Sequence, residues 1–498
     1  MQKKLLTVAV AGALAAPGLA LAQASVEVYG TIYPTFGWVK YSEGFTERDQ
    51  AANTGVWIPN TRTSNLAVGS VSKADVQAPA SNFGVRGRES IGSGLTAWFQ
   101  IEQNAPLERE ATQAVTLASR NSAAGFQGNF GNVFVGQWTT PWADLDSLWA
   151  VGQVSVFGPV TSIIGRRETT GTSPNPAANL NKACTTNLIP PGGVAVPAAG
   201  TNECDSVVGA GGVGHPFWRR ASDMIRYTSP TFAGVTLDLM YQVPEHKTVA
   251  VTTTAAGAPA PAGTATVDAQ PYMYSTSVKW TGMGGRARIG AAYDRHHDFT
   301  SIGDSDTGYA VKGGFNFGVV DVGAAYEKNK YKCKFFPYSA ATTGNLAAGA
   351  ANLANLPALC NGEGDITAKQ WSVAASVPVG LGAIKAFYAK ADDMTGAIGV
   401  GQTGAKEYGV GYEHRFSKRT SLGVEYAKID NNRNAVFTWT GMPPNQLDTG
   451  TGNTPVFGSD VNWFFVGMTH RFEEAATAAI QRAPSGARFF ASLSAWTS

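Results

Sequence analysis

The stretch NFGVRGRESI, residues 82–91, is followed by the turn GSG, residues 92–94, and then by LTAWFQIEQ, residues 95–103. Apolar and polar side chains alternate in both longer segments, and such alternation places them on opposite faces of a β-strand. Two strands joined by so short a glycine turn form an antiparallel hairpin. We therefore predict a two-faced hairpin, in which Arg86 and Arg88 share the face opposite the apolar side chains.

The same alternation recurs on both sides of this hairpin. Further strand-like segments lie at residues 26–41, 117–126, 132–138, 221–229, 235–243, 272–280, 286–296, 308–317, 319–329, 370–378, 383–393, 406–416, 421–430 and 461–472. The links between them alternate between short turns and long polar stretches. An even number of strands with short links on one side and long links on the other is typical of a membrane barrel. The sequence therefore predicts an all-β fold, a 16-stranded antiparallel transmembrane β-barrel.

The composition fits this fold. The chain has 58 glycines, 10% aromatic residues and 15% charged residues, as expected for many twisted strands with tight turns. A soluble β-sandwich is the alternative, but it would need a continuous apolar core, whereas the face opposite the aromatic side chains is charged here. We expect an outward-facing interfacial girdle of aromatic residues, which would have to face inward to serve as sugar-stacking platforms. The girdle residues are Trp38, Trp98, Trp280, Trp371, Trp463 and Phe464.

One link is far longer than the others: residues 139–218 separate two predicted strands. This segment begins TTPWADLDSLW and is rich in Gly, Pro, Ala, Ser and Thr. A structureless insert of this length would count against the strands around it in a compact domain. It fits a hollow fold that receives it, and we predict that residues 139–218 enter the barrel as a constriction loop.

Residues 1–22 have the features of a secretory signal peptide. Lys3 and Lys4 precede an apolar run that ends in the small-x-small sequence ALA. We predict cleavage after Ala22; a membrane anchor is the alternative, but the apolar run is short and ends in a cleavage sequence. Beyond Ala22 no apolar run approaches the roughly 20 residues that a spanning helix needs. Any membrane crossing is therefore expected to be made by strands.

The charge balance excludes one class of partner. Removing the two signal lysines from the 38 basic residues leaves 36, which equals the number of acidic residues. Nucleic-acid-binding proteins carry a basic surface, so we expect no nucleic acid as a partner. The sequence contains no GxSxG motif and no Ser/His arrangement that stands out, so we predict that the chain is not an enzyme. His296 and His297 are adjacent at a loop edge rather than spaced as a helical metal pair, and we predict no metal site and no cofactor.

The four cysteines predict disulfides, because the chain is expected to be exported to an oxidising compartment. Cys184 and Cys204 lie in one predicted loop, and Cys333 and Cys360 lie in another. Four cysteines allow three pairings, of which local pairing within each loop is the simplest. Free thiols are the alternative.

Three longer stretches carry a resemblance to a known family. They are SNFGVRGRESIGSGLTAWFQIE (residues 81–102), SRNSAAGFQGNFGNVFVGQWTTP (residues 119–141) and FVGMTHRF (residues 465–472). Here the chain resembles the trimeric general porins of Gram-negative bacteria, in particular the neisserial and burkholderial type. It departs from them at Asn82, where the family usually has an arginine, and at residues 473–498, a C-terminal extension of unknown role.

The resemblance implies a channel of the bacterial outer membrane, formed by residues 23–472, for passive diffusion of ions and small hydrophilic solutes. It also implies a homotrimer that contacts membrane lipids and lipopolysaccharide, with a terminal segment, FVGMTHRF, that the outer-membrane barrel assembly machinery reads. Because the insert is long, a substrate-specific channel stays open as an alternative. So does a plugged barrel that acts as a surface adhesin or structural protein.

The predicted site combines a basic wall with an acidic loop at the pore constriction. The wall residues are Arg86, Arg88, Arg120, Arg220 and Arg226. The loop residues are Asp144, Asp146 and Glu168. Strand alternation places the wall arginines inside, since an outward charge costs about 2–4 kcal/mol at the bilayer midplane; Arg120 alone rests on the resemblance. Charges at a constriction select ions, although the two aspartates are also suited to capping a short loop helix.

Overall fold

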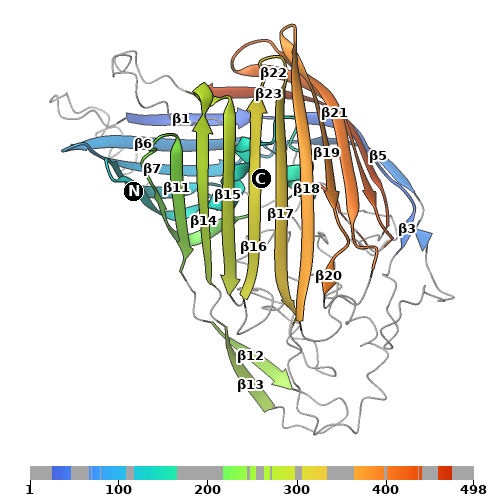
Figure 1. The fold of residues 1–498 in the computed structure, drawn as a ribbon, viewed down its shortest axis with the longest axis horizontal. Coiled ribbons are helices and arrows are strands. Elements are labelled where there is room, and N and C mark those ends of the chain that lie inside the picture. The colour runs from blue at the N-terminus through green and yellow to red at the C-terminus, as the bar shows by residue number, and fades with distance from the viewer. Residues whose placement is uncertain are drawn as a thin grey trace, which may run out of the picture.

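The computed structural model of the chain describes residues 25–45, 67–68, 70–78, 80–107, 117–164, 217–243, 247–253, 263–269, 272–297, 305–333, 364–396, 401–433, 435, 437–439 and 458–473. Within these ranges the chain is nearly all strand, and most strands form one closed antiparallel sheet (Figure 1). None of the helices in these ranges is long and apolar enough to cross a membrane.

The sheet is assembled from strands that pair with their neighbours along the chain. Its segments are β1 (Ser25–Ile32), β2 (Thr35–Tyr41), β5 (Val71–Gln77), β6 (Asn82–Gly92), β7 (Leu95–Asn104), β8 (Ser122–Gly128), β9 (Gly131–Thr139), β10 (Arg220–Thr228), β11 (Val235–Gln242), β14 (Tyr272–Gly282), β15 (Ala287–His297), β16 (Ser305–Asn316), β17 (Asp321–Cys333), β18 (Gly364–Val379), β19 (Gly382–Ala391), β20 (Thr395–Gly396), β21 (Ala405–Arg415), β22 (Thr420–Asn431) and β23 (Val461–Glu473). Figure 1 shows β14 to β19 side by side, with the short turns at one end and the long links at the other.

These 19 segments make 16 strands, because three strands are interrupted. β1 and β2 both pair with β23 and form one strand bent at Pro34, where the chain lacks a backbone donor. β5 and β6 run along this bent strand on its other side, and β20 continues β19 along β18. Since the first and last strands pair, the barrel is closed. The predicted 16-stranded antiparallel barrel is confirmed.

The hairpin that indicated the fold is β6–β7, with Arg88 paired opposite Trp98. Its turn enters the left-handed backbone region at Gly94, where φ is 75°. The tight turn between β16 and β17 does the same at Gly318, where φ is 92°. Glycine adopts this conformation without steric cost, which explains its use at these turns.

Side chains alternate between the outer face and the lumen. On β10, Ile225 is 45% exposed on the outer face, whereas Arg226 is 4% exposed and faces the lumen. β6 follows the same rule, since Phe83 is exposed outside and Arg86 forms an ion pair with Glu27 of β1 inside. Period-two alternation therefore identifies the lumen-facing arginines of these strands.

Two girdle predictions were wrong. Trp463 is fully buried and its ring lies 5.1 Å from that of Phe157, inside the barrel. Trp98 also faces inward, where its indole N–H donates to Asn132. The physical reason for Trp463 is the strand period: its neighbour Phe464 is exposed outside, and consecutive residues of a strand cannot share a face.

Two predicted boundaries also differ. β8 begins at Ser122 rather than at residue 117, because the chain turns at Ala118, where φ is 60°. The long link between the predicted strands at residues 235–243 and 272–280 contains a hairpin of its own, β12 (Lys247–Thr253) with β13 (Gly263–Ala269). A second small hairpin, β3 (Gly44–Phe45) with β4 (Ala67–Val68), lies in the first long link.

Candidate functional site

After β9 the chain turns into the barrel, and we call residues 140–164, the first described stretch of the predicted constriction loop, the insert. It begins with α2 (Pro141–Asp144) and the 3-10 helix η1 (Leu145–Leu148), and later forms α3 (Pro159–Ser162). The Thr140 side chain accepts from the backbone N–H of Ala143 and so caps α2, with a proline in the first turn. Thr140 thus provides the helix cap that was considered for the aspartates.

Asp144 ties the start of the insert to the wall. One carboxylate oxygen accepts from the Thr139 hydroxyl at 2.8 Å, and the other lies 2.6 Å from the Arg226 guanidinium. The same Arg226 nitrogen lies 2.7 Å from Asp238 of β11, and Lys279 of β14 lies 2.7 Å from the other oxygen of Asp238. The result is a charge network that joins the insert to three neighbouring strands.

Asp146 makes a second, more deeply buried attachment. Lys312 of β16 is fully buried and lies 2.7 Å from Asp146 and 2.8 Å from Glu327 of β17. The indole N–H groups of Trp149 and Trp218 both donate to Asp146. Buried ions are tolerated when they are paired and hydrogen-bonded in this way.

Further along, the backbone of the insert is held by basic side chains of the wall. Arg288 of β15 donates to the carbonyl oxygen of Leu148 at 2.8 Å and pairs with Asp321 at 2.6 Å. Lys385 of β19 donates to the carbonyl oxygen of Gln153 at 3.0 Å. The insert therefore follows the inner wall from β10 to β19.

Two buried glutamates of the wall fasten the last part of the insert. Glu425 of β22 accepts from the backbone N–H of Val154 at 2.7 Å and of Ser155 at 3.2 Å. Glu407 of β21 accepts from the Ser162 hydroxyl and from the Trp439 indole. Glu425 thus satisfies two backbone donors that would otherwise be buried without partners, and Glu407 satisfies two side-chain donors.

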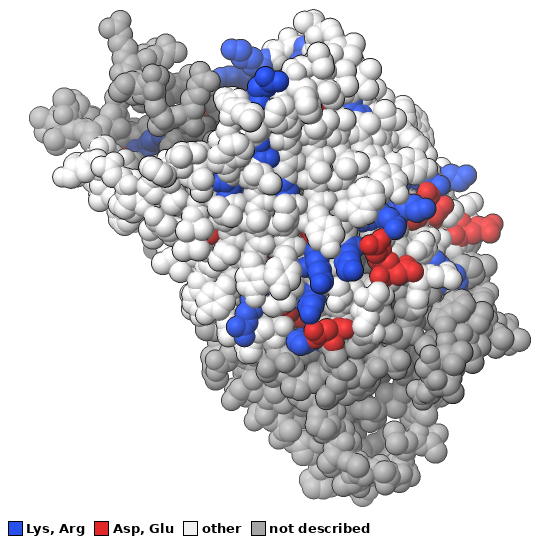
Figure 2. Space-filling model, in the orientation of Figure 1, with Lys and Arg blue, Asp and Glu red and all other residues white. Residues whose placement is uncertain are grey.

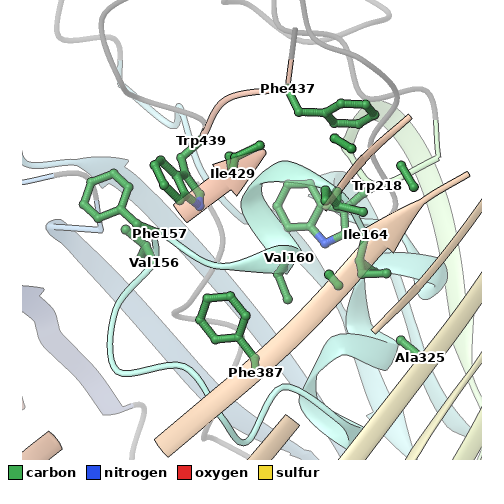
Figure 3. Packing of buried hydrophobic residues seen from close by; sticks show 14 of the residues in the cluster. Val156, Phe157, Val160, Ile164, Trp218, Ala325, Phe387, Ile429, Phe437 and Trp439 are labelled. Carbon is green, nitrogen blue, oxygen red and sulfur yellow. The ribbon is translucent and has the colours of Figure 1, made fainter. Parts of the chain in front are cut away.

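Apolar packing completes the contact. Figure 3 shows Phe157 and Val160 of the insert among Phe387 of β19, Ile429 of β22 and Trp439. These residues are buried and form a hydrophobic core inside the barrel rather than between layers. Within the described residues, the lumen face from β18 through β23 to β2 is therefore covered on part of its length by the insert.

Arginines and glutamates of β1, β6, β7 and the segment before β8 form a separate group. Arg120 lies 2.5 Å from Glu102 of β7, and the Tyr29 hydroxyl donates to the same carboxylate at 2.8 Å. Arg86 pairs with Glu27 at 2.9 Å, and its guanidinium lies over the Tyr29 ring at 4.7 Å. None of the hydrogen bonds or ion pairs described for this group reaches residues 140–164.

The predicted site residues therefore divide between two places. Arg220 donates to Asn121 at 2.7 Å, next to Arg120, and so belongs with the separate group of Arg86 and Arg120. Arg226 joins the insert, with Asp144. Arg88 is exposed near the short-turn end of β6.

Other predicted residues lie beyond what the structure describes. Glu168, Cys184, Cys204 and Cys360 fall outside the described residues, as do the predicted signal peptide and residues 474–498. Cys333 ends β17, with only its backbone described. These predictions stay predictions.

Several lumen residues were missed by the sequence analysis. Lys312 and Glu327 sit at inward positions of strands whose alternation was recognised, so the same rule could have found them. Glu407 and Glu425 also occupy inward positions, but their partners in the insert carry no sequence signal.

Two further observations concern the adjacent histidines and possible metal ligands. His296, predicted to lie at a loop edge, is fully buried, and its ring stacks on Phe217 at 4.6 Å. Across the described ranges, no group of three or more His, Cys, Asp or Glu residues is placed to hold a metal ion.

Comparison with known proteins finds relatives among outer-membrane porins. The outer membrane porin protein 32 of Delftia acidovorans is 24% identical over 434 residues, which cover 86% of this chain and 90% of that protein. Among solved structures, the anion-selective porin from Comamonas acidovorans is similar with a TM-score of 0.51 and 18% identity, over 90% of this chain and 100% of the other. That likeness shows a shared fold. A family model described as Gram-negative porin matches residues 7–434, and the chain therefore belongs to the Gram-negative porin family.

Proposed function

We propose that this outer-membrane channel passes ions and small hydrophilic solutes by passive diffusion, with a preference for anions. The arginines Arg86, Arg88, Arg120 and Arg220 form the basic wall of the passage in this proposal. Asp144, whose side chain stays 20% exposed, contributes to its acidic side, as does Glu168. Arg226 and Asp146 hold the insert in place.

The observation that carries the proposal is the uneven distribution of charge around the lumen. Where the insert lies, Asp144 and Asp146 each contact a cation of the wall. In the described parts of β1, β6, β7, the segment before β8 and the start of β10, the arginines Arg86, Arg88, Arg120 and Arg220 outnumber the paired carboxylates Glu27 and Glu102. Among the described residues, cations therefore outnumber carboxylates on this side of the lumen, and charge at a constriction selects ions.

Two further points support the proposal. The solved relative from Comamonas acidovorans is described as anion-selective, and we propose the same sign here. We also propose a homotrimer, because the outer faces of β6 to β10 present large exposed apolar side chains such as Phe126 and Val135. A cleaved signal at residues 1–22, local disulfides, and recognition of the last strand by the assembly machinery are proposed on the sequence alone.

The test is the reversal potential across a planar bilayer in a salt gradient. We expect the parent protein to favour anions and Arg120→Ala to shift the reversal potential towards cations, because Glu102 loses its buried partner. Arg419→Ala, at an exposed turn outside the lumen, is the matched control and should leave the potential unchanged. An Arg120→Ala channel with the parent's potential removes this arginine from the passage.

A substrate-specific channel is the second candidate. The observation in its favour is the hydrophobic core between the insert and the wall from β18 to β23, which takes up part of the lumen. Small or absent conductance steps in the same bilayer experiment, combined with block by one class of solute, would favour this candidate over general diffusion.

A further inference from the structure

Three aromatic rings meet on the inner wall of the barrel, away from the hydrophobic core that the insert forms. Trp98 of β7 lies 5.3 Å from Phe134 of β9 and 6.0 Å from Trp138 of β9, and the last two rings lie 5.3 Å apart, all measured between ring centroids. Phe134 is 4% exposed, whereas its neighbour Val135 is 55% exposed on the outer face, so the rings share the lumen side. We call Trp98, Phe134 and Trp138 the aromatic triad.

The strand between β7 and β9 carries no side chain where the rings meet. Gly125 of β8 lies directly opposite Trp98 on one side and directly opposite Phe134 on the other. A Cβ atom added at Gly125 would lie 2.4 Å from the Cβ atom of Phe134, which is too close for two non-bonded carbon atoms. The glycine therefore lets rings from two different strands touch across β8.

Two rings of the triad keep part of their surface open. The Arg226 guanidinium lies over the Phe134 ring at 5.8 Å, and Phe134 is buried. Trp98 and Trp138 are only half-buried and lie at the edge of an apolar group of alanine and methionine side chains. The indole N–H of Trp98 already donates to Asn132 at 2.8 Å. What Trp98 still offers to a solute is therefore ring surface.

Cations border the triad on the side of the insert. Thr139, the residue after Trp138, lies directly opposite Arg220. Both contact the side-chain oxygen of Asn121: the Thr139 backbone N–H donates to it at 3.1 Å and Arg220 donates to it at 2.7 Å. Arg120 precedes Asn121 in the chain. A single asparagine thus connects the edge of the triad to two arginines.

Ring surface beside guanidinium groups favours one chemical class of solute. A planar aromatic ring stacks on an indole, and a carboxylate accepts charge-assisted hydrogen bonds from arginine. A neutral sugar would need hydrogen-bonding groups along its ring, and the apolar neighbours of the triad, Ala123, Met224 and Met240, supply none through their side chains. The arrangement therefore fits a ring that carries a carboxylate better than it fits a sugar.

We propose that the aromatic triad, together with Arg120 and Arg220, is a binding subsite for aromatic carboxylates on their way through the channel. The ring of the solute stacks on Trp98 and Trp138, and its carboxylate points to the two arginines. This inference rests on the proposed function, because it requires a solute passage along β7 to β10 that admits anions.

The first experiment measures how sodium benzoate at neutral pH blocks the chloride current through the purified full-length protein in a planar bilayer. Benzoate should halve the current at a concentration about fivefold lower than cyclohexanecarboxylate does, since aromatic pairing contributes about this factor. Cyclohexanecarboxylate has the same charge and ring size without the flat ring. Benzamide, a neutral aromatic ring, and glucose should block more weakly than benzoate. Equal block by the two carboxylates, or stronger block by benzamide or glucose, would overturn the proposal.

Variants of Trp138 test the ring itself. Trp138→Leu keeps an apolar side chain but removes the ring, so it should raise the half-blocking benzoate concentration by about fivefold. Trp138→Phe keeps a ring and should recover most of this loss, and block by cyclohexanecarboxylate should change little in either variant. Conducting channels in the absence of benzoate show that each variant is folded. A parent-like benzoate block in Trp138→Leu would remove Trp138 from the subsite.

Trp371→Leu is the matched control. Trp371 is also half-buried, and it lies directly opposite Lys390, so it combines an indole with a cation. However, it shares the outer face with Val373, which is 47% exposed. Figure 2 shows a largely uncharged area on the outer face, as expected for a surface that contacts lipid. Trp371→Leu should leave the benzoate block unchanged, and a loss equal to that of Trp138→Leu would overturn the proposal.

The reversal potential of the same channels in a salt gradient separates this inference from the proposed function. A preference for anions with equal block by benzoate and cyclohexanecarboxylate would leave the proposed function standing and remove the aromatic subsite. A preference for cations would contradict the proposed ion preference, and the comparison of the two carboxylates would still decide the subsite.

Discussion

Arg226 shows what a single lumen side chain does in this protein. One of its nitrogens lies within ion-pair distance of both Asp144 and Asp238, and another donates to the carbonyl oxygen of Thr139 at 2.9 Å. Without the guanidinium, two carboxylates would face each other in a buried setting. Arg226 therefore acts on the position of the insert through charge compensation.

We expect Arg226→Met to destabilise the barrel by about 3 kcal/mol, because removing one partner of a buried ion pair leaves the other charge uncompensated. The measurement is the urea midpoint of the purified protein in detergent. The double variant Arg226→Met with Asp238→Asn should recover part of this loss. If the double variant is less stable than the single one, charge compensation is not the reason.

Single residues also show how far the sequence was informative. The lumen positions of Arg86 and Arg226 follow from period-two alternation, which needs no knowledge of distant segments. The partner of Asp146 could not be found in this way, because Lys312 lies 166 residues further along the chain. Which strand the insert reaches depends on the closed barrel, and no local pattern records it.

Among the elements, the insert owes its course to the wall rather than to its own helices. α2, η1 and α3 have four residues each, too few for stable isolated helices. Acceptors and cations of β10 to β22 hold its backbone, and Glu425 does so for two consecutive N–H groups. The sequence identified the insert by its length and composition, whereas the glutamates that hold it resembled ordinary lumen residues.

We expect Glu425→Leu to release this part of the insert, because two buried N–H groups lose their acceptor at a cost of about 1–3 kcal/mol each. Hydrogen exchange at the amides of Val154 and Ser155 should become at least about tenfold faster. Glu425→Gln keeps a carbonyl acceptor and should show a smaller change.

The control for this element is Glu413→Gln. Glu413 pairs with the Lys385 side chain at 2.9 Å and accepts no described hydrogen bond from the insert backbone. Exchange at the two amides should stay at the parent's rate in this variant. Equal acceleration in both variants would point to general loosening of the barrel.

For the whole molecule, the outer face has two unlike sides. On several strands from β15 to β2 an outward lysine or arginine lies two residues from an outward aromatic residue, as with Lys390 and Tyr388 of β19. The described outer faces of β7 to β9 instead carry exposed apolar side chains such as Ile101, Phe126 and Val135 without that step. A side with such side chains suits contact with other protomers, and a side with cations suits lipid. Strand alternation could have predicted each outward residue, but not which strands lie together.

We expect Val135→Lys to reduce the trimer fraction in native mass spectrometry, because a charge would be buried between protomers. Val311→Lys on β16 is the matched control, since Val135 is 55% exposed and Val311 is 49% exposed. The control should stay trimeric and give conductance steps in threes. Loss of trimers in the control, with none in Val135→Lys, would place the interface on the other side.

The pairing of the first strand with the last also governs how the molecule is made. Ile32 of β1 pairs with His470 of β23, so the closing contact joins the two ends of the barrel sequence. While the barrel assembles, the first strand keeps unpaired backbone groups along one edge until the last strand is in place. Such open edges invite pairing with other chains, and contacts between distant residues form slowly. Assembly of this protein therefore requires that the edge of the first strand stay protected until the distant last strand pairs with it.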